Sequence, residues 1–271
     1  MSITTTTKSA LLAFVAVALV AAGYFTSIPQ ANALTPLADL QAGDLFRGEA
    51  FSAVYYLSVD GTRYVFPNQN TYDSWFDGDF SDVKFISDSD LTNVQIGGNV
   101  TYKPGTRMIK INTDTRTYMP AADGSLRHVT TEAVAVAYFG ADWNTYIDDL
   151  ADGFFTNYTI GDPINDAAEF DKAAAEAAAV SIDNDKGLVA PASISVGDSG
   201  YSPIDVNISA GQGVRFTNNG NDSHSATADD LTWGTGTLFT GEEFIRRFDE
   251  PGTYTFFDSY DGSNTGAIYV N

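Results

Sequence analysis

Apolar and polar residues alternate along the last third of the chain, after Pro191. Turn-forming stretches separate these runs, for example Asn218-Asn-Gly220 and Pro251-Gly252. A period of two places alternate side chains on opposite faces of a strand, so short runs with such turns predict a β-sandwich over residues 191–271. The alternating apolar pairs are Ile194 and Val196, Val206 and Ile208, Val214 and Phe216, Tyr254 and Phe256, and Ile268 and Val270.

The earlier part of the chain carries a pattern that occurs twice. Asp60-Gly61 and Asp123-Gly124 are 63 residues apart and each lies between strand-like runs, which indicates a hairpin turn. The matches at an offset of 64 are Arg63 with Arg127, Val65 with Val129, and Ile96-Gly97 with Ile160-Gly161. The order of the matches predicts two copies of one unit.

A short helix is expected after each hairpin, over 70–76 and over 131–139, with Thr130 as the N-cap of the second. The two copies together predict one small α+β domain over residues 34–162. The core Asp60–Val65 and the later Ile-Gly resemble a module of secreted and cell-surface bacterial proteins. The second copy departs from it by the extra Leu126 and by His128 in place of tyrosine. The resemblance implies a surface-exposed binding or spacer unit.

An alanine-rich segment connects the two regions. Residues 167–179 contain eight alanines, which favour a helix, and the turn-rich stretch Ser181–Gly187 follows. Residues 163–190 are therefore predicted to be a helical, semi-rigid linker that leads into a flexible joint. A helix that packs on one of the domains is the alternative.

The first 33 residues predict an export signal. Lys8 precedes the apolar run Ala10–Phe25, and Ala31-Asn-Ala33 is a typical cleavage site, so the mature chain would begin at Leu34. The run has 16 residues, fewer than the ~20 that a membrane-spanning helix needs. A retained membrane anchor is the alternative; after cleavage we expect no membrane association. The sequence predicts a secreted, extracellular or cell-surface protein.

The charge and the absence of cysteine argue against nucleic acid binding and against disulfide bonds. The chain has 14 basic and 35 acidic residues, a formal net charge of −21, which becomes −22 without Lys8. Nucleic acid binding needs basic patches, so it is not expected. With no cysteine, an exported chain has no disulfides and each domain depends on its packing.

Four stretches in the C-terminal region resemble a plastocyanin-like cupredoxin. Val214-Arg-Phe-Thr-Asn218 followed by His224 is similar to the strand and first copper histidine of that family. Pro251–Phe257 is similar to its "PGTYTYYC" strand, and Gly266–Val270 to its final "G-x-I-x-V" strand. Tyr201-Ser-Pro203 also fits. The resemblance covers residues 193–271 and implies a Greek-key sandwich.

The copper ligands of this family are largely missing. His224 matches the first histidine, but Asp258 stands where the family has cysteine. Asp261 lies near the second histidine position and Asn264 near the axial methionine. A blue-copper site needs a thiolate and two imidazoles, whereas oxygen donors suit harder cations. Copper-based electron transfer is therefore the least favoured function.

Three interpretations of this loop remain. The site can be empty, with the aspartates in turns. It can hold a hard cation such as calcium on Asp258, Asp261 and Asn264. It can also be a mixed copper(II) or zinc site that includes His224.

No catalytic constellation is present in the sequence. There is no cysteine nucleophile, no G-x-S-x-G context and no phosphate-binding glycine loop. His128 reads as an aromatic replacement for Tyr64. The sequence thus predicts a non-enzymatic exported protein without a cofactor, whose partners are a cell-surface protein, a glycan or sister chains. A divalent-metal carrier or sensor is the alternative.

Overall fold

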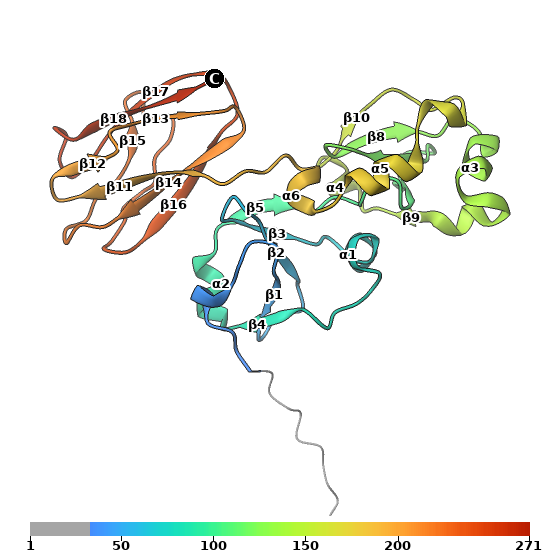
Figure 1. Ribbon diagram of the computed structural model, residues 1–271, viewed down its shortest axis with the longest axis horizontal. Coiled ribbons are helices and arrows are strands. Elements are labelled where there is room, and N and C mark those ends of the chain that lie inside the picture. The colour runs from blue at the N-terminus through green and yellow to red at the C-terminus, as the bar shows by residue number, and fades with distance from the viewer. Residues whose placement is uncertain (1–32) are drawn as a thin grey trace, which may run out of the picture. The chain divides into compact units, whose positions relative to one another are not determined.

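The computed structural model describes residues 33–271 (Figure 1). Residues 1–32, which include nearly all of the predicted signal, lie outside the described residues. Within 33–271, none of the helices is both long and apolar enough to cross a membrane. The described chain is mostly β-sheet, with short helices between the strands.

Residues 34–99 form the first sheet, whose strand order is β4-β1-β2-β3-β5. Its central strands β1, β2 and β3 are antiparallel, while β4 pairs parallel with β1 and β5 pairs parallel with β3. The elements are η1 (Leu37–Asp39), β1 (Leu45–Gly48), β2 (Tyr55–Leu57), β3 (Arg63–Val65), α1 (Gln69–Phe76), β4 (Lys84–Ile86), α2 (Asp88–Asn93) and β5 (Ile96–Asn99).

Residues 108–160 form the second sheet, in the order β10-β8-β7-β6-β9. Here β6, β7 and β8 are antiparallel, β9 pairs parallel with β6, and β10 pairs parallel with β8. The elements are β6 (Met108–Lys110), β7 (Tyr118–Ala121), β8 (Ser125–His128), α3 (Glu132–Phe139), η2 (Gly140–Tyr146), β9 (Ile147–Asp149), α4 (Asp152–Phe155) and β10 (Thr159–Ile160).

The two sheets have the same topology. In chain order, the fourth strand lies beside the first and the fifth beside the third, with the same parallel and antiparallel pairings. The hairpin residues also correspond, because Tyr64 pairs with Tyr56 and His128 pairs with Tyr118. Each sheet has buried clusters of its own, so the two segments do not share one central sheet.

The helices after the hairpins begin at polar caps. The Asn68 side chain accepts from the backbone N–H of Thr71 at 2.8 Å and caps α1. Helix α3 is capped by Thr131, whose hydroxyl accepts from the N–H of Val134 at 3.3 Å, rather than by Thr130. The Thr130 hydroxyl instead donates to the carbonyl of Ile164. Two adjacent threonines offer equal capping chemistry, so the sequence alone did not decide between them.

The alanine-rich segment is divided into short helices that pack on the sheets. It contains η3 (Ala167–Glu169), α5 (Lys172–Ala178) and α6 (Ile182–Asp185) instead of one continuous helix. Phe170 is buried with the second sheet's cluster, and Ile182 with that of the first. The Asp183 carboxylate accepts from the Tyr56 hydroxyl at 2.8 Å. In the described structure the segment therefore contacts both N-terminal sheets.

Residues 192–270 form two four-stranded sheets, β12-β11-β14-β16 and β13-β18-β17-β15. Strands β11 and β14 are parallel, as are β13 and β18, and the other pairs are antiparallel. The strands are β11 (Ala192–Gly197), β12 (Gly200–Ser202), β13 (Asp205–Ile208), β14 (Gln212–Asn218), β15 (Thr227–Ala228), β16 (Glu243–Phe248), β17 (Gly252–Phe257) and β18 (Thr265–Val270).

Both sheets contribute to one core between them. Each of the five alternating pairs predicted from the sequence lies in a strand and packs into this cluster. Phe256 has no exposed surface, and its ring meets those of Tyr201 and Phe216 edge-on at centroid distances of 4.8 and 5.4 Å. Edge-to-face packing of this kind stabilises a core beyond the area it buries. The core fixes the loops that carry the candidate site.

Candidate functional site

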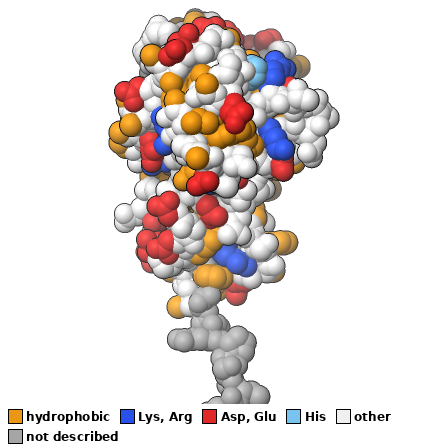
Figure 2. All heavy atoms as spheres, turned by 90° about the vertical axis from the view of Figure 1, so that its right-hand side faces the viewer, with side chains coloured by type: hydrophobic (Ala, Val, Ile, Leu, Met, Phe, Trp, Pro, Cys, Tyr) orange, Lys and Arg blue, Asp and Glu red, His pale blue; other side chains and the backbone are white. Residues whose placement is uncertain are grey.

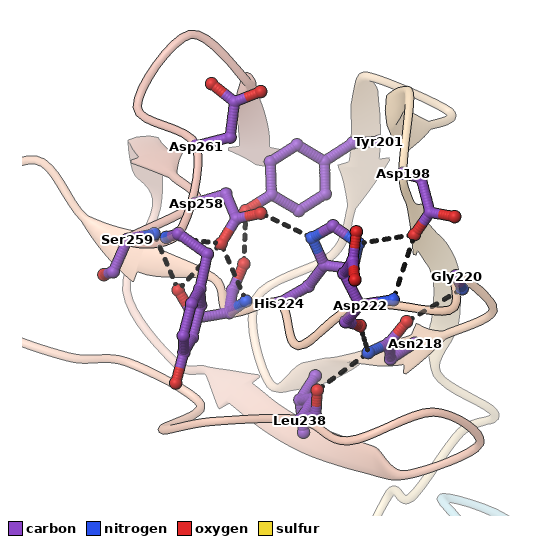
Figure 3. Close-up of polar contacts among 12 residues, drawn as sticks. Asp198, Tyr201, Asn218, Gly220, Asp222, His224, Leu238, Asp258, Ser259 and Asp261 are labelled. Carbon is purple, nitrogen blue, oxygen red and sulfur yellow. Dashed lines mark hydrogen bonds and ion pairs between the residues drawn. The ribbon is translucent and has the colours of Figure 1, made fainter.

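His224 lies in the loop between β14 and β15, and both of its ring nitrogens meet carboxylates (Figure 3). Nδ1 is 2.7 Å from Asp258 Oδ2, and Nε2 is 3.3 Å from Asp198 Oδ1. The residue is 5% exposed, and its backbone pairs with that of Leu238 in both directions. The imidazole is therefore held between two acids and leaves no nitrogen for another ligand.

Asp258 follows β17 and is completely buried. Its Oδ1 accepts from the backbone N–H groups of Ser225 and Tyr260, both at 3.0 Å, and from the Ser225 hydroxyl at 3.3 Å. Its Oδ2 faces His224. A buried carboxylate is costly unless it is hydrogen-bonded and paired, and here both oxygens have partners.

Asp198 approaches from the turn between β11 and β12. Its Oδ1 accepts from the N–H groups of Asn221 and Asp222 at 2.9 and 3.2 Å, and its Oδ2 accepts from the Asn221 side chain at 2.9 Å. The side chain is 42% exposed. It thus ties the β11–β12 turn to the loop that carries His224.

Asn218, the last residue of β14, fixes the same loop from inside. Its side-chain nitrogen donates to the carbonyls of Asp222 and Leu238 at 2.8 and 2.7 Å, and its oxygen accepts from the N–H of Gly220 at 2.8 Å. Asn218 has no exposed surface. One buried amide therefore bonds three backbone groups of the loop, including the Leu238 carbonyl that also accepts from the His224 N–H.

The charges of this cluster stabilise the protonated imidazole. Burial alone would lower the pKa of His224, but the hydrogen bonds and charges of Asp258 and Asp198 outweigh it and raise the pKa above its usual 6.5. The pKa of Asp198 falls to about 2, because of hydrogen bonds from Asn221, from the Asp222 backbone and from His224. The three side chains form a carboxylate–imidazole–carboxylate chain.

The other two predicted ligands do not join this chain. The Asp261 side chain accepts from the N–H and hydroxyl of Ser263 at 3.1 and 2.7 Å, and it points away from His224 (Figure 3). Asn264 meets Asp258 through its backbone carbonyl, which accepts from the Asp258 N–H at 3.0 Å. Its side-chain oxygen lies beside Gly200. Of the four predicted ligands, only His224 and Asp258 lie together.

These residues do not fit a type 1 copper centre. The chain supplies no thiolate, and the one imidazole of the loop is hydrogen-bonded at both nitrogens. Among residues 33–271, no three histidine or acidic side chains are arranged to hold a metal ion. The Asp261 side chain bonds Ser263, and the Asn264 backbone rather than its side chain meets Asp258, so these two side chains do not join His224 and Asp258 in the described structure.

The hydroxyl of Ser225 does not hydrogen-bond to the His224 ring in the described structure. Ser225 directly follows His224, but its Oγ contacts Asp258, Thr227 and the Ser259 N–H. A histidine that activates a serine must accept its proton directly. In the described structure both His224 nitrogens face carboxylates instead.

Sequence reasoning missed Asp198 and the role of Asn218. Asp198 lies in Gly197-Asp-Ser-Gly200, a stretch typical of any turn, so nothing in the sequence linked it to His224. Asn218 ends the strand that resembles the cupredoxin motif, and this position was a usable signal. The polar cluster depends on pairing across three loops, which only the fold brings together.

Comparison with known proteins gives matches to solved structures alone. No family profile and no curated protein matches the chain. The similar structures include cupredoxins, and the three described here each match 30% of this chain. The purple cupredoxin from Nitrosopumilus maritimus is 24% identical over 99% of its length, with a TM-score of 0.28. A mutant fern plastocyanin is 24% identical over its whole length, with a TM-score of 0.27. An amicyanin variant is 15% identical over 81% of its length, with a TM-score of 0.29.

The His224 pKa can be measured directly. NMR titration of the imidazole should give a value above 6.5, and Asp198→Asn should lower it, because one of the two carboxylates loses its charge. A folded-state pKa above the unfolded value contributes stability that is complete below about pH 6.5 and is lost as the pH rises through the folded pKa. The free energy of unfolding should fall over that range.

Asp205→Asn is a matched control, because Asp205 is an exposed acid of the same domain without a contact to His224. It should leave the His224 titration unchanged. A wild-type value at or below 6.5 would contradict the ion-pair description.

Proposed function

We propose that this chain is an exported, non-enzymatic protein of the cell surface or extracellular space, and that its C-terminal domain is a degenerate, Greek-key cupredoxin-like module used for binding or assembly. The observation that carries the proposal is the state of His224. Both of its nitrogens are bound to Asp258 and Asp198, so the loop that would bind copper is closed by the protein's own hydrogen bonds. The network then serves to hold three loops in place.

The N-terminal region fits a binding or spacer role. The shared topology of the two five-stranded sheets supports two copies of one unit, as the offset of 63–64 residues predicts. The copies carry their own buried clusters and would present two similar surfaces side by side along the chain. Multiple copies of a surface module favour binding to a repeated partner.

Charge and surface composition are consistent with an extracellular location. Acidic side chains are spread over the face shown in Figure 2, with fewer basic ones among them. A large net charge favours the solubility of a protein. The partners that agree with these features are a cell-surface protein, a glycan or sister chains.

The test is to isolate the protein from fractionated producing cells. We expect it in the extracellular or surface fraction, with Leu34 at its N-terminus. After exposure to copper, zinc, calcium and manganese and then desalting, it should retain no stoichiometric metal. A plastocyanin treated in parallel serves as the positive control for copper retention.

One equivalent of metal that is retained by the wild type and lost in His224→Ala would overturn the structural role and favour a metal carrier. A cytoplasmic location with an intact N-terminus would overturn the surface role.

A further inference from the structure

The outer edge of the sandwich sheet β12-β11-β14-β16 is formed by β16, Glu243–Phe248. Its inner side pairs with β14 over six residues. The N–H and C=O groups of successive residues in a strand point to opposite sides. Both groups of Ile245 bond Gln95, which lies outside this sheet, and this shows that they point away from β14. The N–H and C=O groups of Glu243 and Arg247 therefore also point outward. The Ile245 side chain is buried and lies close to Gly61 of the first sheet's hairpin, so the free part of this edge is the outward groups of Glu243 and Arg247. Strand edges with unpaired groups are templates for another strand.

One position of this edge is already occupied by a side chain. The amide of Gln95, just before β5, donates to the Ile245 carbonyl at 2.8 Å and accepts from the Ile245 N–H at 3.0 Å. A side-chain amide presents the same donor and acceptor as a backbone peptide, so Gln95 imitates one residue of a neighbouring strand. It leaves the outward groups of Glu243 and Arg247 without such a partner among the hydrogen bonds of the described residues.

The sequence of β16 is self-complementary about Ile245. In an antiparallel pair centred on this residue, Ile245 would face Ile245 of a second copy. Glu243 would face Arg247 in both directions, and Phe244 would face Arg246. Opposite charges directly across a strand pair are favourable, and an arginine beside an aromatic ring adds a cation–π contact. The same register pairs every outward-pointing backbone group of the edge.

We propose that β16 is the self-association edge of this protein, and that Gln95 occupies its centre in the monomer and competes with a second copy. The pairing is a twofold, isologous addition of β16 to β16. The monomer's own ion pairs at this edge, Glu243 with Arg215 at 3.7 Å and Arg247 with Asp249 at 2.6 Å, are partly exposed. Partly exposed ion pairs contribute little to stability, so Glu243 and Arg247 could leave these partners and pair with a second copy instead.

The test uses the full mature chain in sedimentation equilibrium. Gln95→Ala removes the competing amide, and we expect self-association at least about tenfold tighter than that of the wild type, since two hydrogen bonds no longer have to be broken. Gln69→Ala is the matched control, because Gln69 is an exposed glutamine with no partner at β16. It should behave as the wild type.

Charge reversal tests the register. In the Gln95→Ala chain, Arg247→Glu would place two pairs of like charges across the strands and should abolish the gain. The further change Glu243→Arg should restore it, because the opposite pairing returns. This rescue separates a β16 pair from association through another surface.

The inference rests on the proposed function only for its choice of a sister chain as partner. A Gln95→Ala chain that stays monomeric up to about 1 mM, which corresponds to a very weak interaction, would overturn it. Association that Arg247→Glu does not reduce would overturn it as well. Either outcome leaves the surface location and the metal content, which test the proposed function, unaffected.

Discussion

Asp258→Ala is expected to lower the free energy of unfolding of the sandwich by about 3–5 kcal/mol, because removing one partner of a buried ion pair leaves the other charge uncompensated. The substitution takes the 2.7 Å partner from His224 and leaves the N–H groups of Ser225 and Tyr260 without their acceptor. Asp258 has no exposed surface, so water cannot easily replace it. Urea unfolding, followed by methyl NMR signals of Ile194 and Val214 in the core, measures this loss.

Asp261→Ala is the matched control, since Asp261 is an exposed acid three residues further along the same loop. Its contacts with Ser263 are local, and the change should cost less than about 1 kcal/mol. If Asp258→Ala unfolds at the same urea concentration as Asp261→Ala, the network does not hold the loops together.

Phe256→Ala should destabilise the same domain by about 3–5 kcal/mol, through lost burial and the cavity that remains. The ring is fully buried and meets Tyr201, Phe216 and Trp233, with the last at a centroid distance of 6.1 Å. This is a large share of the ~5–15 kcal/mol that stabilises an ordinary domain. The same urea experiment applies.

Tyr269→Ala provides the comparison, because Tyr269 lies on the neighbouring strand β18 but is 38% exposed. It should cost much less than Phe256→Ala. Equal losses for the two variants would mean that the core between the sheets is not closely packed around Phe256.

The strands of the sandwich could be predicted from sequence, because a strand with one buried face alternates apolar and polar residues. Ile194 and Val196 are separated by Ser195 and flanked by Ser193, and both are buried in the core between the sheets. Strand β16 was harder to predict, since Phe244 and Phe248 face the core while Ile245 is buried on the other side. A strand covered on both faces loses the simple period.

The equivalence of the two N-terminal sheets was visible only in part. The Asp-Gly turns lie at the hairpins, where Gly61 and Gly124 adopt a positive φ that favours glycine. The Ile-Gly pairs lie at the parallel fifth strands. The parallel fourth strands, β4 and β9, share no residue pattern, so the sequence did not reveal them. Pairing between distant segments depends on the whole fold rather than on local preference.

The residues of the candidate site could likewise be predicted only in part from the sequence. His224 and Asp258 could be placed together because both lie at positions that the cupredoxin resemblance defines. Asp261 and Asn264 could not be judged, since turn residues satisfy their own loop as readily as a metal. Asp198 lies in a third loop, and nothing in the sequence indicated that it would contact His224.

The order of the second sandwich sheet has a consequence for biosynthesis. β18 lies between β13 and β17, so Thr265–Val270 fills an interior position of a sheet that otherwise contains only earlier residues. Until that stretch has been synthesised, β13 has no neighbour in its sheet and Phe256 lies against an incomplete core. All strands of the two N-terminal sheets precede residue 161, and the residues that complete their cores, Phe170, Ile182 and Leu188, also precede the sandwich. A nascent chain would therefore carry folded N-terminal sheets ahead of an unfinished sandwich.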